Sequence, residues 1–269
     1  MDDTLITGGE GVLGSYCDFG VHVGRAGLDV TDAAAVFKKC GSMKPRVIVH
    51  AAALTNLVFC ETHPDEAMRV NALGTENMAR AAREAGAKLI YISTSDVFDG
   101  ALGRPYTPED KPNPVSVYGK SKYEGELAVM RELDDYVIMR VSWMFGGGAG
   151  EDNKFVGKLL ALNDPAEFRA VTDKKGSPSW AKDVAVAIRT LIKQDARGLF
   201  HIGGGVATRY GMAEAIIAAK GWHTRLIAAT PSDFPSAYPI GNDQSMPLSP
   251  YVRPWQDALC EYIETEWRK

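Results

Sequence analysis

Several features that would assign this chain to a membrane or nucleic-acid-binding class are absent from its sequence. Its 269 residues carry 30 basic and 34 acidic side chains, interspersed along the chain, for a net charge of -4. Without a basic stripe or a polybasic tail we expect no nucleic-acid partner and no anionic lipid surface. No apolar run approaches the roughly 20 residues that span a bilayer, and the first residues lack the basic start of a secretory signal. We therefore expect a cytoplasmic protein with no membrane partner.

Cysteine is also scarce. Cys17, Cys40, Cys60 and Cys260 are scattered along the chain and form no Cys-x-x-Cys motif. No histidine stands near them at the spacing of metal ligands. We expect free structural thiols and no metal site.

A glycine-rich turn follows the first apolar segment. Thr4–Thr7 has the composition of a short strand and runs directly into the sequence Gly8-Gly-Glu-Gly11-Val-Leu-Gly14. This spacing lets the backbone turn tightly, approach a pyrophosphate and aim a helix N-terminus at it. The segment predicts a dinucleotide site, and the alternative is a simple glycine-rich turn.

The chain then returns to the sheet unusually soon. Residues 15–20 leave little room for a complete helix, so the first crossover must be abbreviated, and Val21–Val23 is the expected second strand. Gly24 and Arg25 follow, where a dinucleotide fold reads the adenosine ribose, and no acid stands there. A carboxylate at that place would bond the ribose hydroxyls of NAD, whereas Arg can pair with the extra phosphate of NADP. The sequence favours NADP(H) over NAD(H), although Arg25 could equally be a solvated loop residue.

Apolar runs and helical patterns alternate through the first half of the chain. They predict an α/β fold, a Rossmann-type doubly wound parallel sheet with a small C-terminal α/β substrate-binding part. We expect residues 1–145 to form the dinucleotide-binding domain, with residues 180–205 returning to it, and residues 146–269 to form most of the substrate-binding part. The expected strands are 4–7, 21–23, 46–50, 88–93, 136–140, 170–172 and 199–202. The expected helices are 33–40, 64–85 with an interruption at 71–74, one that carries Tyr118, and 155–162, 181–193, 211–220 and 255–267, and residues 231–254 should form a loop over a cleft.

Hydroxyl, phenol and ammonium groups are expected at one edge of this sheet. The strand at 88–93 delivers Thr94 and Ser95 to its carboxyl edge, where open α/β sheets bind ligands. Tyr118 and Lys122 are four residues apart and share a helix face. A nearby cation lowers the pKa of a tyrosine from about 10 towards a working pH, so the phenol can give a proton to a carbonyl oxygen. The pattern predicts a carbonyl reductase, and the alternative is a chance pair on a helix surface.

A series of motifs in one order supports this interpretation. They are Thr7 to Gly14, Leu28-Asp-Val-Thr-Asp32, His50-Ala-Ala-Ala53, Val70-Asn-Ala-Leu-Gly74, Ile92 to Gly100, Pro112-Asn-Pro114, Tyr118-Gly-Lys-Ser-Lys122, Arg140-Val-Ser-Trp143, Lys154-Phe-Val156 and Gly176-Ser-Pro-Ser179. With them the chain resembles the extended short-chain dehydrogenases/reductases and, within these, the dTDP-4-dehydrorhamnose reductase branch, the RmlD-like sugar-nucleotide-binding family. The resemblance covers nearly the whole chain.

The resemblance implies NADP(H)-dependent reduction of a nucleotide-linked 4-keto-6-deoxy sugar. Tyr118 would protonate the C4 carbonyl oxygen as hydride reaches the carbon, Thr94 would bond that oxygen, and Lys122 would hold the nicotinamide ribose and lower the Tyr118 pKa. The expected cofactor contacts are Gly8, Gly11, Val12, Leu13, Gly14, Arg25, Asp29, Val30, Ala53, Leu54 and Thr55, together with Tyr118 and Lys122. The residues expected at the sugar are Thr94, Ser95 and Trp143.

Two departures from the family pattern concern the substrate. The family commonly continues with Asp and Tyr after the threonine, whereas Ser95 and Asp96 follow Thr94 here, and Tyr238-Pro239 stands where the family tends to show Arg-Pro. They leave two alternatives open: a dinucleotide-binding regulatory subunit resembling the beta subunit of methionine adenosyltransferase, and a sugar-nucleotide epimerase or dehydratase. A homodimer is compatible with each of these functions.

Overall fold

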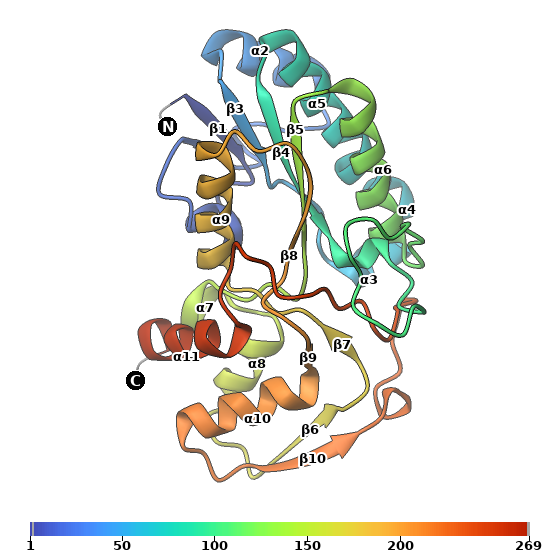
Figure 1. Ribbon diagram of the computed structural model, residues 1–269, viewed down its shortest axis with the longest axis vertical. Coiled ribbons are helices and arrows are strands. Elements are labelled where there is room, and N and C mark those ends of the chain that lie inside the picture. Colours follow the sequence, from blue (N-terminus) through green and yellow to red (C-terminus); the bar gives the residue numbers. More distant parts are fainter. Residues whose placement is uncertain (2, 268–269) are drawn as a thin grey trace.

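A six-stranded parallel sheet forms the upper part of the computed structural model, which describes Met1 and residues 3–267 (Figure 1). The strand order is β2-β1-β3-β4-β5-β8. The strands are β1 (Thr4–Thr7), β2 (Val21–Val23), β3 (Val47–His50), β4 (Lys88–Thr94), β5 (Tyr136–Val141) and β8 (Gly198–Ile202). All five pairings are parallel, so the predicted Rossmann-type sheet is confirmed.

Helices cover both faces of this sheet, and its inner strands β1 and β4 are buried throughout. Leu5 packs in one core with α2 (Ala33–Met43), α5 (Gly74–Ala85) and α6 (Val117–Glu132). Its neighbour Ile6 points to the opposite face and packs with α9 (Ala181–Lys193). Successive side chains of a strand face opposite ways, so an unbroken apolar run is what a doubly covered strand requires.

The first crossover is as short as the sequence predicts. Its helix α1 spans only Val12–Ser15, and Leu13 and Cys17 pack into the core that α9 shares with the sheet. In Figure 1 the late helix α9 stands in front of this face. A helix from the second half of the chain therefore covers sheet surface that a longer first helix would otherwise protect.

The predicted interruption of the second helical segment, 64–85, is a stretch of π-helix. Helix α4 (Pro64–Met68) continues into the π-helix η1 (Arg69–Leu73) and then into α5. A Cβ on Gly74 would lie 2.7 Å from Cγ2 of Val30, so glycine permits this helix to approach the loop that precedes α2. The π-helix carries Asn71, which belongs to the site described below.

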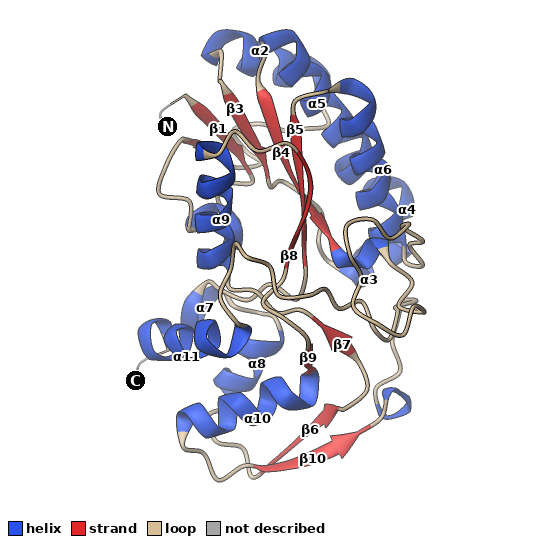
Figure 2. Cartoon of the chain, viewed as in Figure 1, coloured by secondary structure: helices blue, strands red, loops and turns tan. Residues whose placement is uncertain are grey.

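A smaller α/β lobe lies beyond the carboxyl edge of the sheet (Figure 2). Strand β6 (Glu167–Val171) pairs in parallel with β10 (Arg225–Ala229), and β7 (Lys175–Gly176) pairs antiparallel with β9 (Ala207–Thr208). Its helices are α7 (Gly148–Glu151), α8 (Phe155–Leu162), α10 (Arg209–Lys220) and α11 (Trp255–Glu266), packed around a core that includes Phe145, Trp180 and Tyr262. The four later helices predicted from the sequence are present, whereas β7, β9, β10, α7 and the helix α3 (Leu57–Thr62) were missed.

The segment 231–254 is irregular except for the single 3-10 turn η3 (Pro231–Asp233). All four cysteines are free, and only Cys260 is exposed. Within Met1 and residues 3–267, no helix combines the length and apolar character that a bilayer crossing needs.

Candidate active site

Thr94 and Tyr118 meet at the carboxyl edge of the sheet. Thr94 is the last residue of β4, and Tyr118 lies in the first turn of α6, which Ser116 caps by accepting a 3.0 Å hydrogen bond from the amide of Gly119. The Tyr118 phenol lies close enough to the Thr94 hydroxyl for that hydroxyl to affect its pKa. Lys122 follows one turn later, and only 2 % of it is exposed. The structure thus places the predicted hydroxyl, phenol and ammonium on adjoining elements.

The Tyr118 phenol is a protonated group at neutral pH. Burial raises its pKa above the ordinary value, and the nearby charge of Asp96 raises it further, while the Thr94 hydroxyl partly opposes this. The expected lowering of this pKa by Lys122 is therefore not what the structure shows, because loss of solvent around the phenol dominates. A protonated phenol is suited to donate a proton rather than to accept one.

Lys122 is held between an aromatic ring and a buried acid. Its Nζ lies 4.2 Å from the centroid of the Tyr91 ring. Burial lowers the pKa of Lys122 to about 7, and the charge of Glu126 acts in the opposite direction. Glu126 in turn pairs with Arg140 at 2.7 Å and accepts a 2.5 Å hydrogen bond from Ser93 Oγ. The pairing with Arg140 fixes the negatively charged Glu126 carboxylate, which lies one turn from Lys122 on α6.

A neutral histidine fastens the end of β3 to its neighbours. His50 is fully buried, with Nδ1 2.7 Å from Thr7 Oγ1 and Nε2 3.1 Å from Thr75 Oγ1. Burial lowers the pKa of His50 to about 3, and the charge of Lys122 adds to the effect. The imidazole therefore acts as a hydrogen-bonding spacer that aligns the ends of β1 and β3 with α5.

The glycine-rich turn has the close packing that a dinucleotide loop needs. Gly8 has a φ of +69°, and a Cβ there would lie 2.7 Å from the amide nitrogen of Ala52. A Cβ on Gly14 would collide with the carbonyl oxygen of Gly8, while the Gly11 amide donates a 3.0 Å hydrogen bond to that oxygen. Val12 and Leu13 then open α1. Only glycine allows this backbone path, which leaves the turn open to a pyrophosphate.

An acid and a base flank the expected adenosine end of the site. Arg25 is exposed in the turn after β2. The Glu10 carboxyl packs directly against Gly24, where a Cβ would overlap its atoms. No acid follows β2 in the sequence, but the Glu10 carboxyl reaches this position because the glycine-rich turn folds back over β2, with a 3.1 Å hydrogen bond from the Gly9 amide to the Val23 carbonyl. Sequence spacing gave no sign of Glu10, since it approaches from the preceding loop.

Asp29 and Val30 lie in the next loop and are anchored there. The Asp29 carboxylate accepts hydrogen bonds from the amide and the hydroxyl of Thr31 at 2.9 and 2.8 Å, and these bonds lower its pKa. Val30 is buried, and its carbonyl accepts a 3.0 Å hydrogen bond from Asn77 Nδ2. Both residues are therefore in a rigid loop, with the Asp29 side chain partly committed to its own turn.

The segment Ala53-Leu54-Thr55 is tied to the helix that carries Tyr118. Asn71 accepts a 2.8 Å hydrogen bond from the Leu54 amide and donates a 3.0 Å one to the Leu54 carbonyl. Its amide nitrogen also donates to Ser121 Oγ at 3.0 Å, and Ser121 donates to the Tyr118 carbonyl at 2.8 Å. Sequence reasoning assigned no role to Asn71, although the interrupted helix around it was a usable signal.

Of the two other residues expected at the sugar, Ser95 is buried and serves the fold. Its hydroxyl donates a 3.0 Å hydrogen bond to Ser142 Oγ, which also accepts one of 3.1 Å from the Ser177 amide. These bonds join the end of β4 to Ser142, which follows β5, and to Ser177, which follows β7. The Ser95 hydroxyl is therefore directed towards Ser142.

Trp143 lies where the sheet meets the smaller lobe. It has a φ of +42°, and a Cβ on Gly176 would collide with its indole. The guanidinium carbon of Arg209, the first residue of α10, lies 3.6 Å from the centroid of this ring. Arg209 is near enough to Lys174 and to Asp96 for their charges to affect one another. The sequence pattern assigned no role to Arg209 or Lys174 at this boundary between the sheet and the smaller lobe.

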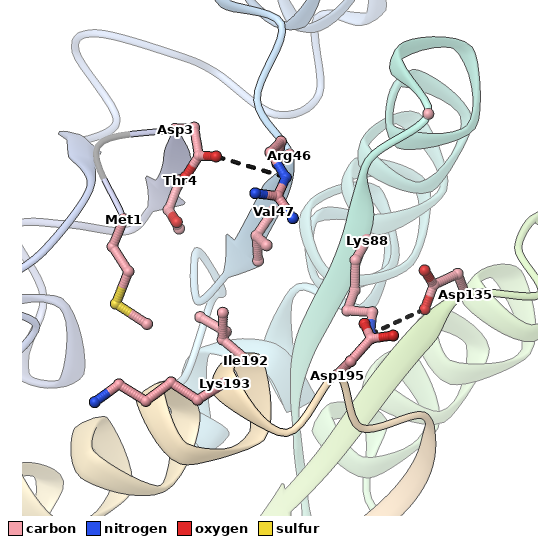
Figure 3. A pocket seen from close by; sticks show the side chains of 11 residues that line it. Met1, Asp3, Thr4, Arg46, Val47, Lys88, Asp135, Ile192, Lys193 and Asp195 are labelled. Atoms are coloured by element: carbon pink, nitrogen blue, oxygen red, sulfur yellow. Dashed lines mark hydrogen bonds and ion pairs between the residues drawn. The ribbon is translucent and has the colours of Figure 1, made fainter.

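A separate cavity of about 460 Å³ opens at the opposite, amino edge of the sheet (Figure 3). Its lining includes Thr4 and Lys88, which begin β1 and β4. Lys88 is only 6 % exposed, and its ammonium pairs with Asp135 at 3.2 Å and with Asp195. The cavity lies one full strand away from Thr94, and its buried lysine clamps the chain beyond α9 to the sheet. No cluster of metal-ligating side chains is found among Met1 and residues 3–267.

Comparison with known proteins adds independent findings. Residues 2–263 match the family model described as RmlD substrate binding domain. The dTDP-4-dehydrorhamnose reductase of Mycobacterium tuberculosis is 33 % identical over 281 aligned residues, covering 95 % of this chain and 90 % of that protein. A solved dTDP-4-dehydrorhamnose reductase from Clostridium acetobutylicum is 31 % identical, with a TM-score of 0.94 over 98 % of this chain and 99 % of that one. The Bacillus anthracis enzyme, solved in complex with NADP, is 28 % identical, with a TM-score of 0.91 over 97 % and 99 %.

Proposed function

Since the chain belongs to the RmlD substrate binding domain family of sugar-nucleotide oxidoreductases, we propose that it reduces a nucleotide-linked 4-keto-6-deoxy sugar with NADP(H). The relatives named dTDP-4-dehydrorhamnose reductase support the substrate class, and the neighbour solved with NADP supports a nicotinamide dinucleotide. The placement of the buried Tyr118 phenol beside the Thr94 hydroxyl, one turn from Lys122, carries the proposal.

Each member of this set has one task. Bound NADPH supplies the hydride for the carbonyl carbon. Tyr118 donates its proton to the carbonyl oxygen as negative charge develops there, and the Thr94 hydroxyl positions that oxygen. The raised pKa of Tyr118 keeps the proton in place until it is needed. The Lys122 ammonium holds the nicotinamide ribose, and Glu126 and the Tyr91 ring fix its position.

The cofactor is held by backbone as much as by side chains. The turn at Gly8, Gly11 and Gly14 takes the pyrophosphate, with Val12 and Leu13 at the helix start behind it. Two further segments line the sides of the cofactor site. They are Asp29 with Val30, and the residues from Ala53 to Thr55. Arg25 is exposed and free to meet a ribose phosphate, which supports NADPH over NADH.

The substrate is expected in the space between the sheet edge and the smaller lobe. Trp143 offers an aromatic face there, and its partner Arg209 adds a positive charge. That charge suits the diphosphate of a nucleotide sugar.

A turnover assay tests the proposal directly. Purified protein with dTDP-4-keto-6-deoxymannose should oxidise NADPH, read from the nicotinamide absorbance. Tyr118→Phe removes the proton donor and should lower kcat by about 10²- to 10⁴-fold, while NADPH affinity changes little. Tyr123→Phe, on the same helix and half-buried, is the matched control and should keep its activity. Wild-type protein that binds NADPH and reduces no keto-sugar nucleotide would refute the reductase function.

A further inference from the structure

Asp96 is a carboxyl group at the reacting end of the site for which the proposed reaction has no use. Thr94 Oγ1 donates a 3.0 Å hydrogen bond to Asp96 Oδ2, and the Asp96 amide donates a 3.1 Å bond back to the same hydroxyl. The Gln244 side chain, whose Nε2 donates a 2.7 Å hydrogen bond to the Phe98 carbonyl, lies near enough to lower the pKa of the Asp96 carboxyl. Asp96 is half-buried, so the group is fixed in place and still reachable.

A carboxylate at this point opposes carbonyl reduction unless something compensates it. Negative charge grows on the carbonyl oxygen in the transition state, and the single Thr94 hydroxyl proton, which must turn to that oxygen to position it, is donated to Asp96 in the structure. Burial raises the pKa of Asp96, while the bond from Thr94 and the charges of Lys174 and Arg209 act in the opposite direction. An ionised carboxylate accepts about four hydrogen bonds, so the bond from Thr94 leaves capacity for a donor that arrives with the substrate.

The position of Asp96 determines which substrate atom it meets. With the reacting carbonyl oxygen at Tyr118 and Thr94, as proposed above, the Asp96 carboxylate lies beside the substituents of a carbon adjacent to the carbonyl. A methyl group or hydrogen there would leave a half-buried charge without a partner, whereas a hydroxyl would donate a charge-assisted hydrogen bond to it.

We propose that Asp96 selects ketone substrates that carry a hydroxyl on the carbon next to the reacting carbonyl, which in a 4-keto-6-deoxy sugar is the C3 hydroxyl. This inference rests on the proposed function and narrows its substrate class. Asp96 makes or breaks no covalent bond in it. The hydroxyl donates its hydrogen bond to the carboxylate and so separates that charge from the carbonyl oxygen.

The test compares dTDP-4-keto-6-deoxymannose with its 3-deoxy counterpart. Wild-type protein should favour the hydroxylated substrate by about 10- to 100-fold in kcat/KM, the value of a hydrogen bond to a charged group. Asp96→Ala should reduce this preference to about threefold or less, because the C3 hydroxyl then loses the carboxylate that accepts its hydrogen bond. Asp96→Asn keeps an acceptor oxygen and should retain most of the preference. Asp96→Ser provides the same comparison as Asp96→Ala if that variant does not fold.

Ser95→Ala is the matched control, because the neighbouring Ser95 hydroxyl is directed to Ser142 and should not affect the preference. A wild-type preference near one, or one that survives in Asp96→Ala, overturns the inference while leaving the reductase function intact. Calorimetric binding of the two 4-hydroxyl products to NADP⁺-loaded protein gives the same ratio without turnover. Equal affinities in that measurement also overturn the inference, whereas absent turnover with any keto sugar overturns the proposed function.

Discussion

The Asn71 side chain makes two hydrogen bonds to the backbone of Leu54, accepting one of 2.8 Å from its amide and donating one of 3.0 Å to its carbonyl. The same side chain reaches Ser121 on the helix of Tyr118. One buried amide therefore fixes the Leu54 segment, which is expected to contact the cofactor, relative to the helix that carries Tyr118. The π-helix supplies the local geometry that turns this amide towards both.

Replacing Asn71 by Ala should loosen the cofactor site. Both Leu54 groups would lose their partner, so we expect the free energy of unfolding to fall by about 2–3 kcal/mol. NADPH affinity should fall by about tenfold, because the segment must be ordered again on binding. Ser121→Ala removes the bond from Asn71 to α6 and the Ser121 bond to the Tyr118 carbonyl but leaves both Leu54 bonds, so it should cost about 1 kcal/mol with little loss of affinity. Urea unfolding and NADPH fluorescence titration measure both effects, and an unchanged affinity in Asn71→Ala would remove the positioning role.

Cofactor choice should depend on Arg25 and Glu10 in opposite directions. Arg25→Ala should weaken NADPH binding by about 10- to 100-fold through loss of a charge-assisted hydrogen bond to the ribose phosphate, and leave NADH nearly unaffected. Glu10→Gln removes a negative charge that packs against Gly24 and should strengthen NADPH binding relative to NADH. Titrating each variant with both nucleotides measures the two ratios. Equal losses of NADPH and NADH affinity in Arg25→Ala would contradict the NADP(H) preference.

The contrast between Tyr118 and Asp96 shows how much of the site is readable from the sequence. The sheet, and the placing of Thr94 and Tyr118 at its edge, follow from local signals: strand ends, glycine spacing and a four-residue helical interval. Glu10 against Gly24 could not be predicted in that way, nor could Asp96 near Arg209. These contacts join segments whose approach is decided by packing of the whole chain. Strand β6 was predicted only at its end and β10 was missed, since both strands are largely exposed or half-buried and so show no clear apolar face.

His50 should make the fold sensitive to acid. Its pKa is about 3 in the folded protein, against 6.5 ordinarily, so between these pH values the unfolded chain binds the extra proton and stability falls as the pH falls. From pH 7 to pH 4 this one group should cost about 3 kcal/mol. His50→Gln can still bond to Thr7 and Thr75 and should shrink the difference in unfolding free energy between the two pH values by that amount.

His201 provides a second buried case, because burial and Arg140 lower its pKa to about 4. His201→Gln should therefore reduce the difference as well, and by less than His50→Gln. Urea unfolding at the two pH values would contradict the assignment if His50→Gln kept the full wild-type difference.

The pair Glu126–Arg140 should be far more costly to break than to replace. Both side chains are at most 3 % exposed, and their atoms approach to 2.7 Å. Glu126→Gln leaves the Arg140 guanidinium uncompensated in the interior and should lower the free energy of unfolding by about 3–5 kcal/mol. The double variant Glu126→Leu with Arg140→Leu removes both charges, so its loss should be smaller than the sum of the single losses. Asp3→Asn at the exposed Arg46 pair is the surface control and should have a much smaller effect. Additive losses in the double variant, measured by urea unfolding, would show that the two charges do not stabilise one another.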